Sequence, residues 1–244
     1  MLLAIAEGGD LYTQERLGNL YESGIHIPKD LAAAVSWYQK ASDQGDQLSA
    51  TKLREIGQSI FDGTNYTKGI EAKLQLMQLA PFSNNKLYQT ELARAFVKLG
   101  RIGDALPWFR KAAKQDDRFA QTLLGNLLIK RKERDVEIAE GKYWLIQAAK
   151  SGYGFAQNSL GSAYELGRWG EPDFGEAVRW YSKAVKQEDR EGVASNSLGN
   201  LYWDGRGVPQ DYAIAADFYR RSAKLGHPYS IGRLGEMLID GKGA

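Results

Sequence analysis

Hydrophobic and polar positions along residues 198–226 describe one complete structural unit. Apolar residues recur at helical spacing through LGNLYWDG, residues 198–205, which predicts a short helix with one buried face. A loop of Gly, Val and Pro follows and ends at Asp211, a residue type that caps helix N-termini. Ala215, Phe218, Tyr219 and Ala223 then repeat at helical spacing until Gly226. The pattern therefore predicts two antiparallel helices joined by a turn.

The eight-residue opening of this unit, which we call the octet, recurs along the whole chain. Octets begin about every 36 residues, at Leu17, Ile56, Leu92, Leu124, Leu160, Leu198 and Leu234. One large residue of the second helix keeps the same phase, as Trp37, Leu74, Trp108, Trp144, Trp180 and Phe218. Small residues flank it on both sides, so neighbouring helices can approach closely while the large side chain fills the space between them. This period predicts an all-α fold, an α-solenoid of stacked antiparallel helix pairs.

We expect a single continuous repeat array over residues 1–244, with helix pairs opening near residues 17, 56, 92, 124, 160 and 198. Residues 1–10 resemble the end of a second helix, and residues 229–244 begin another unit. Neither end carries a dedicated polar capping face, which terminal units of such arrays usually have. The sequence therefore predicts partial repeats at both ends and a chain that is a fragment of a longer protein.

Three motifs resemble the Sel1-like repeat, a relative of the tetratricopeptide repeat. They are the LGxxYxxG octet, the loop endings VPQD (208–211) and IPKD (27–30), and the AxxWYxKA segments at 34–41 and 177–184. The Leu92 copy is closer to an ordinary tetratricopeptide repeat, and the Ile56 copy lacks the second-helix aromatics. The resemblance implies a right-handed superhelix that acts as a non-catalytic scaffold or adaptor and binds a partner protein or peptide on its concave face.

The resemblance also implies the cellular processes and compartments in which the protein acts. Bacterial relatives are often exported and serve cell-envelope assembly, polysaccharide export, signalling or host interaction, while eukaryotic relatives act as adaptors in endoplasmic-reticulum protein degradation. The resemblance favours a location in the bacterial periplasm or cell envelope, or a secreted protein. The cytoplasm is the second choice.

Composition excludes several classes of function. With 32 basic and 30 acidic residues and a net charge of +2, the chain has no global field that would recruit nucleic acid or an anionic membrane. The absence of cysteine excludes disulfides, thiolate catalysis and Cys-ligated metal sites. No run of 18 apolar residues exists, so we expect no transmembrane segment.

Candidate chemistry is sparse. The two histidines, His26 and His227, lie near prolines and have no partner at a motif spacing that suggests a triad or a metal site. Gly205, Arg206 and Gly207 lack the preceding strand and the GK[ST] ending of a phosphate-binding loop. We therefore predict that the protein is not an enzyme and has no catalytic residue, metal site or cofactor.

Two irregular segments interrupt the repeat phase. Residues 80–87 combine Pro, Ser and two Asn and predict a surface turn between units. Residues 130–137, KRKERDVE, are dense in charge. They are either a basic patch for a partner or, as we favour, a solvated connection whose cations suit a helix C-terminus.

Two columns of the first helices carry the predicted binding site. The residue two before the octet and the residue after its first Gly are four apart and share a face, which in such arrays lines the concave side. Asn is a poor residue for helix interiors, yet five fall in these columns. Either they grip the backbone of an extended peptide or they bond a neighbouring repeat, and both interpretations stay open. The predicted partner-binding residues are Glu15, Asn19, Arg94, Thr122, Asn126, Asn158, Ser162, Asn196, Asn200, Trp203 and Glu236. Apolar contact one turn earlier would come from Tyr12, Phe119, Phe155 and Tyr229.

Two alternatives belong to other functional classes. A helical-repeat protein that binds RNA needs a basic concave stripe, whereas these columns are mostly neutral. An enzyme with a site between repeats is less favoured still, because nothing in the sequence nominates a nucleophile, base or metal. The sequence leaves the oligomeric state open.

Overall fold

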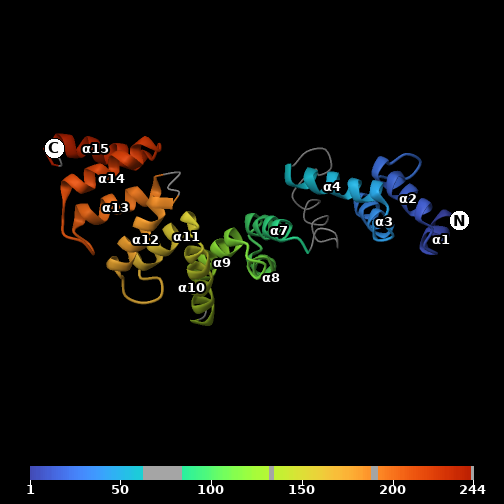
Figure 1. Cartoon of the computed structure of the whole chain (residues 1–244), viewed down its shortest axis with the longest axis horizontal. Helices are drawn as coiled ribbons and strands as arrows, with labels where there is room; N and C mark the ends of the chain where they lie inside the picture. The colour runs from blue at the N-terminus through green and yellow to red at the C-terminus, as the bar shows by residue number, and fades with distance from the viewer. Residues whose placement is uncertain (63–83, 132–134, 188–191, 243–244) are drawn as a thin grey trace. The chain divides into compact units, whose positions relative to one another are not determined.

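The computed structural model describes residues 1–62, 84–131, 135–187 and 192–242 (Figure 1). These residues form thirteen α-helices and no strand, which confirms the all-α prediction. The chain divides into two compact units, Met1–Gln115 and Asp116–Ala244.

In the N-terminal unit, each described helix packs against its neighbour in the chain. Helix α1 lies against α2, α2 pairs with α3, α3 contacts α4, and α7 pairs with α8. Their bounds are α1 Leu2–Glu7, α2 Leu11–Ser23, α3 Leu31–Asp43, α4 Gln47–Asp62, α7 Lys86–Lys98 and α8 Ile102–Ala113. Leu74, the large residue expected in the second helix of the Ile56 copy, and most of the turn expected at 80–87 lie outside the described residues.

The C-terminal unit is a run of helices in which every consecutive pair is in contact (Figure 1). Its helices are α9 Arg118–Arg131, α10 Asp135–Lys150, α11 Gly154–Glu165, α12 Phe174–Gln187, α13 Val193–Asp204, α14 Tyr212–Lys224 and α15 Pro228–Ile239. The most extensive contacts join α9 with α10, α11 with α12, and α13 with α14. These are the stacked helix pairs that the repeat period predicts.

The ends of the loop within a repeat are fixed by local chemistry. At the end of the octet, Gly24 and Gly205 adopt the left-handed conformation with φ of 71° and 70°, which glycine reaches without steric cost. At the other end, Asp211 caps α14 by accepting a hydrogen bond from the backbone N–H of Ile214 at 2.9 Å. Asp30 caps α3 in the same way. The predicted cap at Asp211 is confirmed.

One backbone hydrogen bond closes this loop in three repeats. The N–H groups of Asp30, Asp173 and Asp211 each donate to a tyrosine carbonyl of the preceding helix at 3.0 Å, on Tyr21, Tyr164 and Tyr202 respectively. Because the same bond recurs, the three loops bring the second helix back at the same point of the repeat.

The first helices begin before the octet. Helix α2 begins at Leu11, where the side chain of Asp10 accepts a hydrogen bond from the N–H of Thr13 at 2.8 Å, whereas its octet begins at Leu17. The octet is therefore the second half of the first helix. Its regular apolar residues are visible in the sequence, while the first half varies more from copy to copy.

The octet glycine lies under an aromatic ring of the second helix. Tyr38, Tyr181 and Tyr219 are among the largest fully buried side chains. A Cβ added to Gly18, Gly161 or Gly199 would lie 2.5 to 2.8 Å from these rings. The glycine therefore permits the close approach of the two helices of a pair.

The tyrosine column follows directly after the large residue that the sequence analysis assigned to the core. Trp37 and Trp180 are also buried, at 8% exposure each. Trp108, Trp144 and Phe218 are half-buried. On the outer side, a lysine three residues later covers the ring: the Nζ atoms of Lys40 and Lys183 lie 4.0 Å from the ring centroids of Trp37 and Trp180.

Burial of Tyr219 predicts a loss of stability in alkali. Burial raises the pKa of its hydroxyl to about 12, against about 10 in an unfolded chain. Between these two values the unfolded state releases the proton while the folded state keeps it, so the free energy of unfolding falls as pH rises. Denaturant titrations from about pH 9 to pH 11 should show this fall in the wild type and a smaller one in Tyr219→Phe. Equal slopes for both proteins would contradict the assignment.

Candidate binding face

The first helices of the C-terminal unit carry a polar stripe opposite their buried side. On α11, Ala156, Leu160 and Ala163 are buried. The residues at spacings of three, four and seven from Phe155 are Asn158, Ser159 and Ser162, which remain partly accessible. Residues at equivalent positions lie on α9, α13 and α15. We call this surface the first-helix face; it comprises Phe119, Asn126, Phe155, Asn158, Ser159, Ser162, Asn196, Asn200, Trp203 and Tyr229.

Hydrogen bonds across this face join first helices of neighbouring repeats. The amide nitrogen of Asn126 on α9 donates to the hydroxyl of Ser159 on α11 at 3.0 Å. The hydroxyl of Ser230 on α15 donates to the amide oxygen of Asn196 on α13 at 2.8 Å. These bonds give two of the asparagines a role in the stack.

The second asparagine column also bonds inside the repeat. The Tyr219 hydroxyl donates to the amide oxygen of Asn200 at 2.8 Å. The Tyr38 hydroxyl lies within hydrogen-bond distance of two acceptors, the amide oxygen of Asn19 at 2.9 Å and the carboxylate of Glu22 at 2.5 Å. In the repeat that has Ser162 at this position, the Tyr181 hydroxyl donates to Glu165 at 2.8 Å, the residue equivalent to Glu22. These bonds favour the interpretation that the amide oxygens stabilise the stack, and they explain why asparagine is retained inside a helix.

The remaining predicted residues lie in different surroundings. On α2, the amide nitrogen of Asn19 donates to Glu15 at 2.9 Å, and on α7 Arg94 forms an ion pair with Glu91. Thr122 is fully buried and donates to the carbonyl of Arg118 at 2.7 Å, so it lies beneath the first-helix face. Glu236 is exposed and accepts from Arg233 at 2.9 Å.

Asn158 differs from the other asparagines of the face. Its side chain is half-buried, and its amide oxygen is buried without a hydrogen-bond partner in the part of the chain that the structure describes. A buried polar atom without a partner lowers stability by about 1–3 kcal/mol. Asn158 is therefore a place where a bound molecule can complete the hydrogen bonding of the protein.

Aromatic side chains border the polar stripe. The rings of Phe119 and Phe155 lie 6.4 Å apart, and Phe155 remains 43% exposed. Tyr229 on α15 is 51% exposed. At the other end of the first helices, Trp203 packs on Tyr212 at 4.7 Å between ring centroids.

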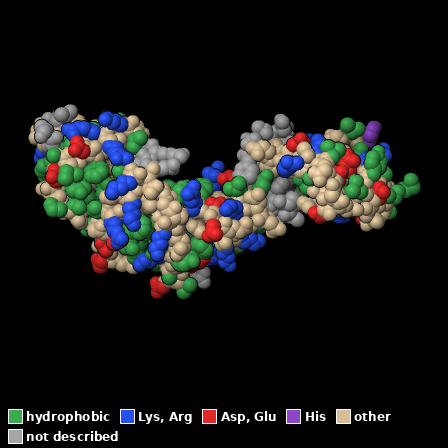
Figure 2. Space-filling view, viewed as in Figure 1, with side chains coloured by type: hydrophobic (Ala, Val, Ile, Leu, Met, Phe, Trp, Pro, Cys, Tyr) green, Lys and Arg blue, Asp and Glu red, His purple; other side chains and the backbone are tan. Residues whose placement is uncertain are grey.

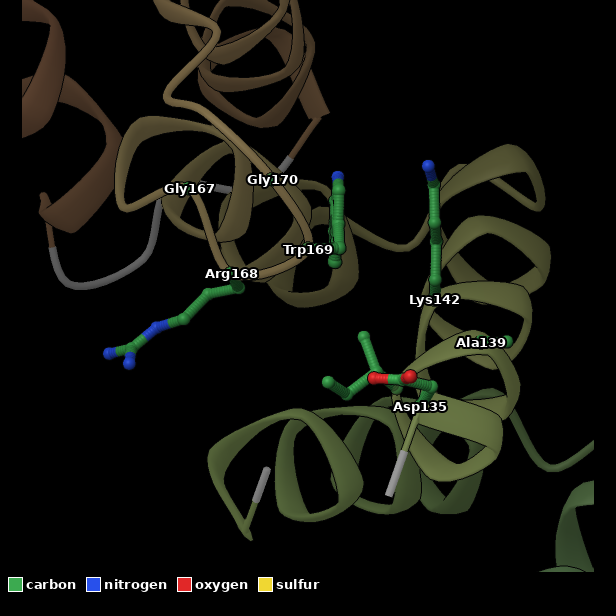
Figure 3. Close-up of a pocket in the computed structure, with 8 residues that line it drawn as sticks. Asp135, Ala139, Lys142, Gly167, Arg168, Trp169 and Gly170 are labelled. Atoms are coloured by element: carbon green, nitrogen blue, oxygen red, sulfur yellow. The ribbon is translucent and has the colours of Figure 1, made fainter. Parts of the chain in front are cut away.

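Two hollows lie in this part of the C-terminal unit, and the first of them is on the first-helix face. The α9–α11 hollow, of about 160 Å³, is lined by Asn126, Ile129, Lys130, Ser159, Ser162, Ala163, Leu166 and Arg168. A second hollow, of about 490 Å³, lies between α10 and the loop after α11 and is lined by Asp135, Ile138, Ala139, Lys142, Gly167, Arg168, Trp169 and Gly170 (Figure 3). In it, the Nζ of Lys142 lies 5.2 Å from the Trp169 ring centroid.

The sequence analysis did not select Lys130, Arg168 or Trp169. Lys130 belongs to the charge-dense segment 130–137, for which a basic patch was the less favoured interpretation. Arg168 and Trp169 occupy the loop that reads GRWGEPD, where another copy reads GRGVPQD. A tryptophan in a loop position that elsewhere holds glycine or histidine is the signal that could have marked them.

Neither a membrane span nor a metal site appears in the ranges that the structure covers. None of the described helices is both long and apolar enough to cross a bilayer. The described residues contain no group of three or more His, Asp or Glu side chains arranged to hold a metal ion.

Stacked helix pairs with a recurring Gly–Tyr contact define a helical-repeat solenoid. The Sel1 repeat model matches residues 12–46, 104–117, 119–153, 154–189 and 193–227, together more than half of the chain. The chain belongs to the Sel1 repeat family. The matches include the Leu17, Leu124, Leu160 and Leu198 copies and the second helix of the Leu92 copy.

Solved structures agree with this assignment. A protective antigen of uropathogenic Escherichia coli strains with an SLR fold is 27% identical, with a TM-score of 0.64 over 98% of this chain. This chain spans 51% of that antigen. A Sel1 repeat protein from Oxalobacter formigenes is 25% identical, with a TM-score of 0.65 over 100% of this chain and 70% of that protein. No curated protein matches the chain.

Proposed function

We propose that this protein is a non-catalytic interaction scaffold whose first-helix face in the C-terminal unit binds an extended segment of a partner protein. The observation that carries the proposal is the incompletely bonded amide of Asn158 in the middle of a polar stripe. An amide both donates and accepts hydrogen bonds, as a peptide group does. After rotation of its amide, Asn158 could pair with a backbone N–H of the bound segment.

The other asparagines of the face support a pre-organised site. Asn126 and Asn196 are held by bonds to serines of the next repeat, and Asn200 is held by Tyr219. A side chain already fixed in one rotamer loses little conformational entropy on binding. The amide oxygen of Asn200 is occupied by this bond, which leaves its amide nitrogen as a donor toward a ligand.

Apolar anchors flank the polar stripe. Phe155 and Tyr229 expose ring surface at the start of their helices. Aromatic residues dominate binding energy at interfaces when a partner covers them. An extended segment would therefore bond to the amides through its backbone and place apolar side chains against these rings.

We further propose a process at a bacterial cell surface, in envelope assembly, export, signalling or host interaction. Support comes from the similarity to a protective antigen of uropathogenic Escherichia coli. Fractionation of host cells should place the protein with envelope or secreted material, and its recovery from the cytosol alone would contradict this assignment.

Peptide selection tests the binding face. A library of random peptides of about 12 residues, which span about 40 Å when extended, would be selected on the wild type. The double variant Asn158→Arg/Ser162→Arg adds long charged side chains to α11 on this face. We expect it to bind the selected peptides at least about tenfold more weakly, a change of about 1.4 kcal/mol.

The matched control is Gln187→Arg/Ala213→Arg, which adds the same residue type at exposed positions of second helices α12 and α14. It should bind the peptides as the wild type does, and circular dichroism should show equal folding of all three proteins. Selection of no peptide above background, or equal binding by the α11 variant, would overturn the proposal.

A further inference from the structure

The α9–α11 hollow is a cationic site on the first-helix face. Lys130 and Arg168 line it together with the side chains of Asn126, Ser159 and Ser162, and no acidic side chain is among its described lining residues. Ile129 and Ala163 provide an apolar floor. A hollow with two cations, two hydroxyls and an amide is complementary to a carboxylate.

Comparison of equivalent positions in two repeats shows that Arg168 lacks an acidic partner that Arg206 has. Arg168 and Arg206 both follow the glycine that ends an octet, so they are equivalent positions of successive repeats. The Nη2 of Arg206 lies 2.9 Å from Asp204 of its own octet, where the equivalent residue before Arg168 is Leu166. This Nη2 also lies 3.5 Å from the carboxylate of Glu165, the sixth residue of the octet in the preceding repeat. For Arg168, the preceding repeat is the Leu124 copy, and the sixth residue of its octet is Ile129. The repeat therefore supplies a carboxylate to Arg206 and none to Arg168.

Both cations of the hollow are available. The side chains of Lys130 and Arg168 have no hydrogen bond, ion pair or ring contact among the residues that the structure describes. In Figure 3 the Arg168 side chain points away from Asp135, Lys142 and Trp169, so the acid of the second hollow does not neutralise it. Figure 2 shows Lys and Arg side chains in a broken row over the C-terminal unit, beside hydrophobic ones.

From this geometry we infer that the α9–α11 hollow binds an Asp or Glu side chain of the partner segment, whose carboxylate takes the place that Glu165 has beside Arg206. The inference rests on the proposed function and specifies the chemistry of the partner. An internal acidic side chain fits better than a chain end, because Phe155 and Asn158 on one side and the α13 residues on the other continue the same face past the hollow.

The test compares acid preference rather than binding alone. The peptide selection would be run in parallel on the wild type and on Lys130→Gln/Arg168→Gln, which removes both charges and keeps polar side chains. We expect the wild type to select peptides with Asp or Glu at one shared position and the variant to lose this preference. A peptide selected on the wild type should bind the variant about tenfold more weakly than it binds the wild type. This difference in affinity should shrink at high salt, where charge pairs are screened.

Peptide changes complete a double-mutant cycle. Replacement of the shared acid by Gln or Asn should weaken binding to the wild type about tenfold and leave binding to the variant unchanged. Lys186→Gln/Lys224→Gln, two exposed lysines of second helices, is the charge-matched control and should bind as the wild type does.

The outcomes separate this inference from the proposed function. Peptides that depend on Asn158 and Ser162 but show no acid preference, or bind Lys130→Gln/Arg168→Gln equally, would overturn the inference alone. If binding to the wild type is lost when the peptide C-terminus is amidated, but not when the shared acid is replaced by Gln or Asn, the hollow binds a chain end. This result would also overturn the inference. Failure to select any peptide would overturn both.

Discussion

Trp180→Ala should lower the free energy of unfolding by about 3–5 kcal/mol. The ring is 8% exposed and belongs to a core cluster with Ile129, Leu145 and Leu160, which come from the two preceding first helices and one second helix. Its removal would leave a cavity between repeats as well as lose the transfer free energy of the ring. The indole N–H also donates to Glu176 at 3.0 Å, and this bond would be lost. Urea unfolding followed by circular dichroism measures the effect.

Tyr143→Ala is the control for this substitution. Tyr143 is an aromatic residue of α10 that is 54% exposed, so its removal should change stability by less than about 1 kcal/mol. A Trp180→Ala variant as stable as Tyr143→Ala would show that the second-helix tryptophan is not part of the core, and the repeat register would then be wrong.

Gly199→Ala should destabilise the protein by about 1–3 kcal/mol, although alanine is the better helix former. The added Cβ would lie 2.6 Å from the Tyr219 ring, which is fully buried and cannot move without displacing its neighbours. The hydrogen bond from Tyr219 to Asn200 would be strained by the same displacement. Thermal or denaturant unfolding would show the loss.

The chain contains a matched control for this effect at the same repeat position. Gly235 is the octet glycine of α15, and a Cβ added there meets nothing within 4 Å among the described residues. Gly235→Ala should therefore leave stability unchanged or raise it by a few tenths to about 1 kcal/mol, because alanine loses less backbone entropy in a helix. If both glycines behave alike, the Gly–Tyr contact does not set the helix spacing.

The sequence predicted the fold because most copies of the repeat carry the same local signals. The octet glycine, the N-capping Asp and the second-helix aromatics recur in phase, so several copies identify each position. The tyrosine that packs on the glycine was not singled out, because burial of one of two adjacent aromatics depends on the direction in which the helix faces its partner. Periodicity places Trp180 and Tyr181 next to each other but does not rank their burial.

The candidate face was predictable in position but not in bonding. Helical spacing placed Asn158 and Ser162 on one face, whereas the bonds of Asn126 to Ser159 and of Tyr219 to Asn200 depend on which residue lies opposite in space. The cationic hollow was missed for the same reason. Lys130 and Arg168 are 38 residues apart in number, and only the comparison of Arg206 with Glu165 reveals that Arg168 has no acid.

The loop between the octet glycine and the capping Asp has a consequence for how this protein changes its specificity. Its two ends are held by a left-handed glycine, by the Asp cap and by the same bond to a tyrosine carbonyl in three repeats. The residues between these anchors do not set the path of the second helix. They can differ between repeats only within the space that each loop allows. Trp169 fits its own loop, whereas a Cβ added at the equivalent Gly207 would lie 2.5 Å from the backbone of Phe174. New recognition chemistry can therefore arise here one loop at a time.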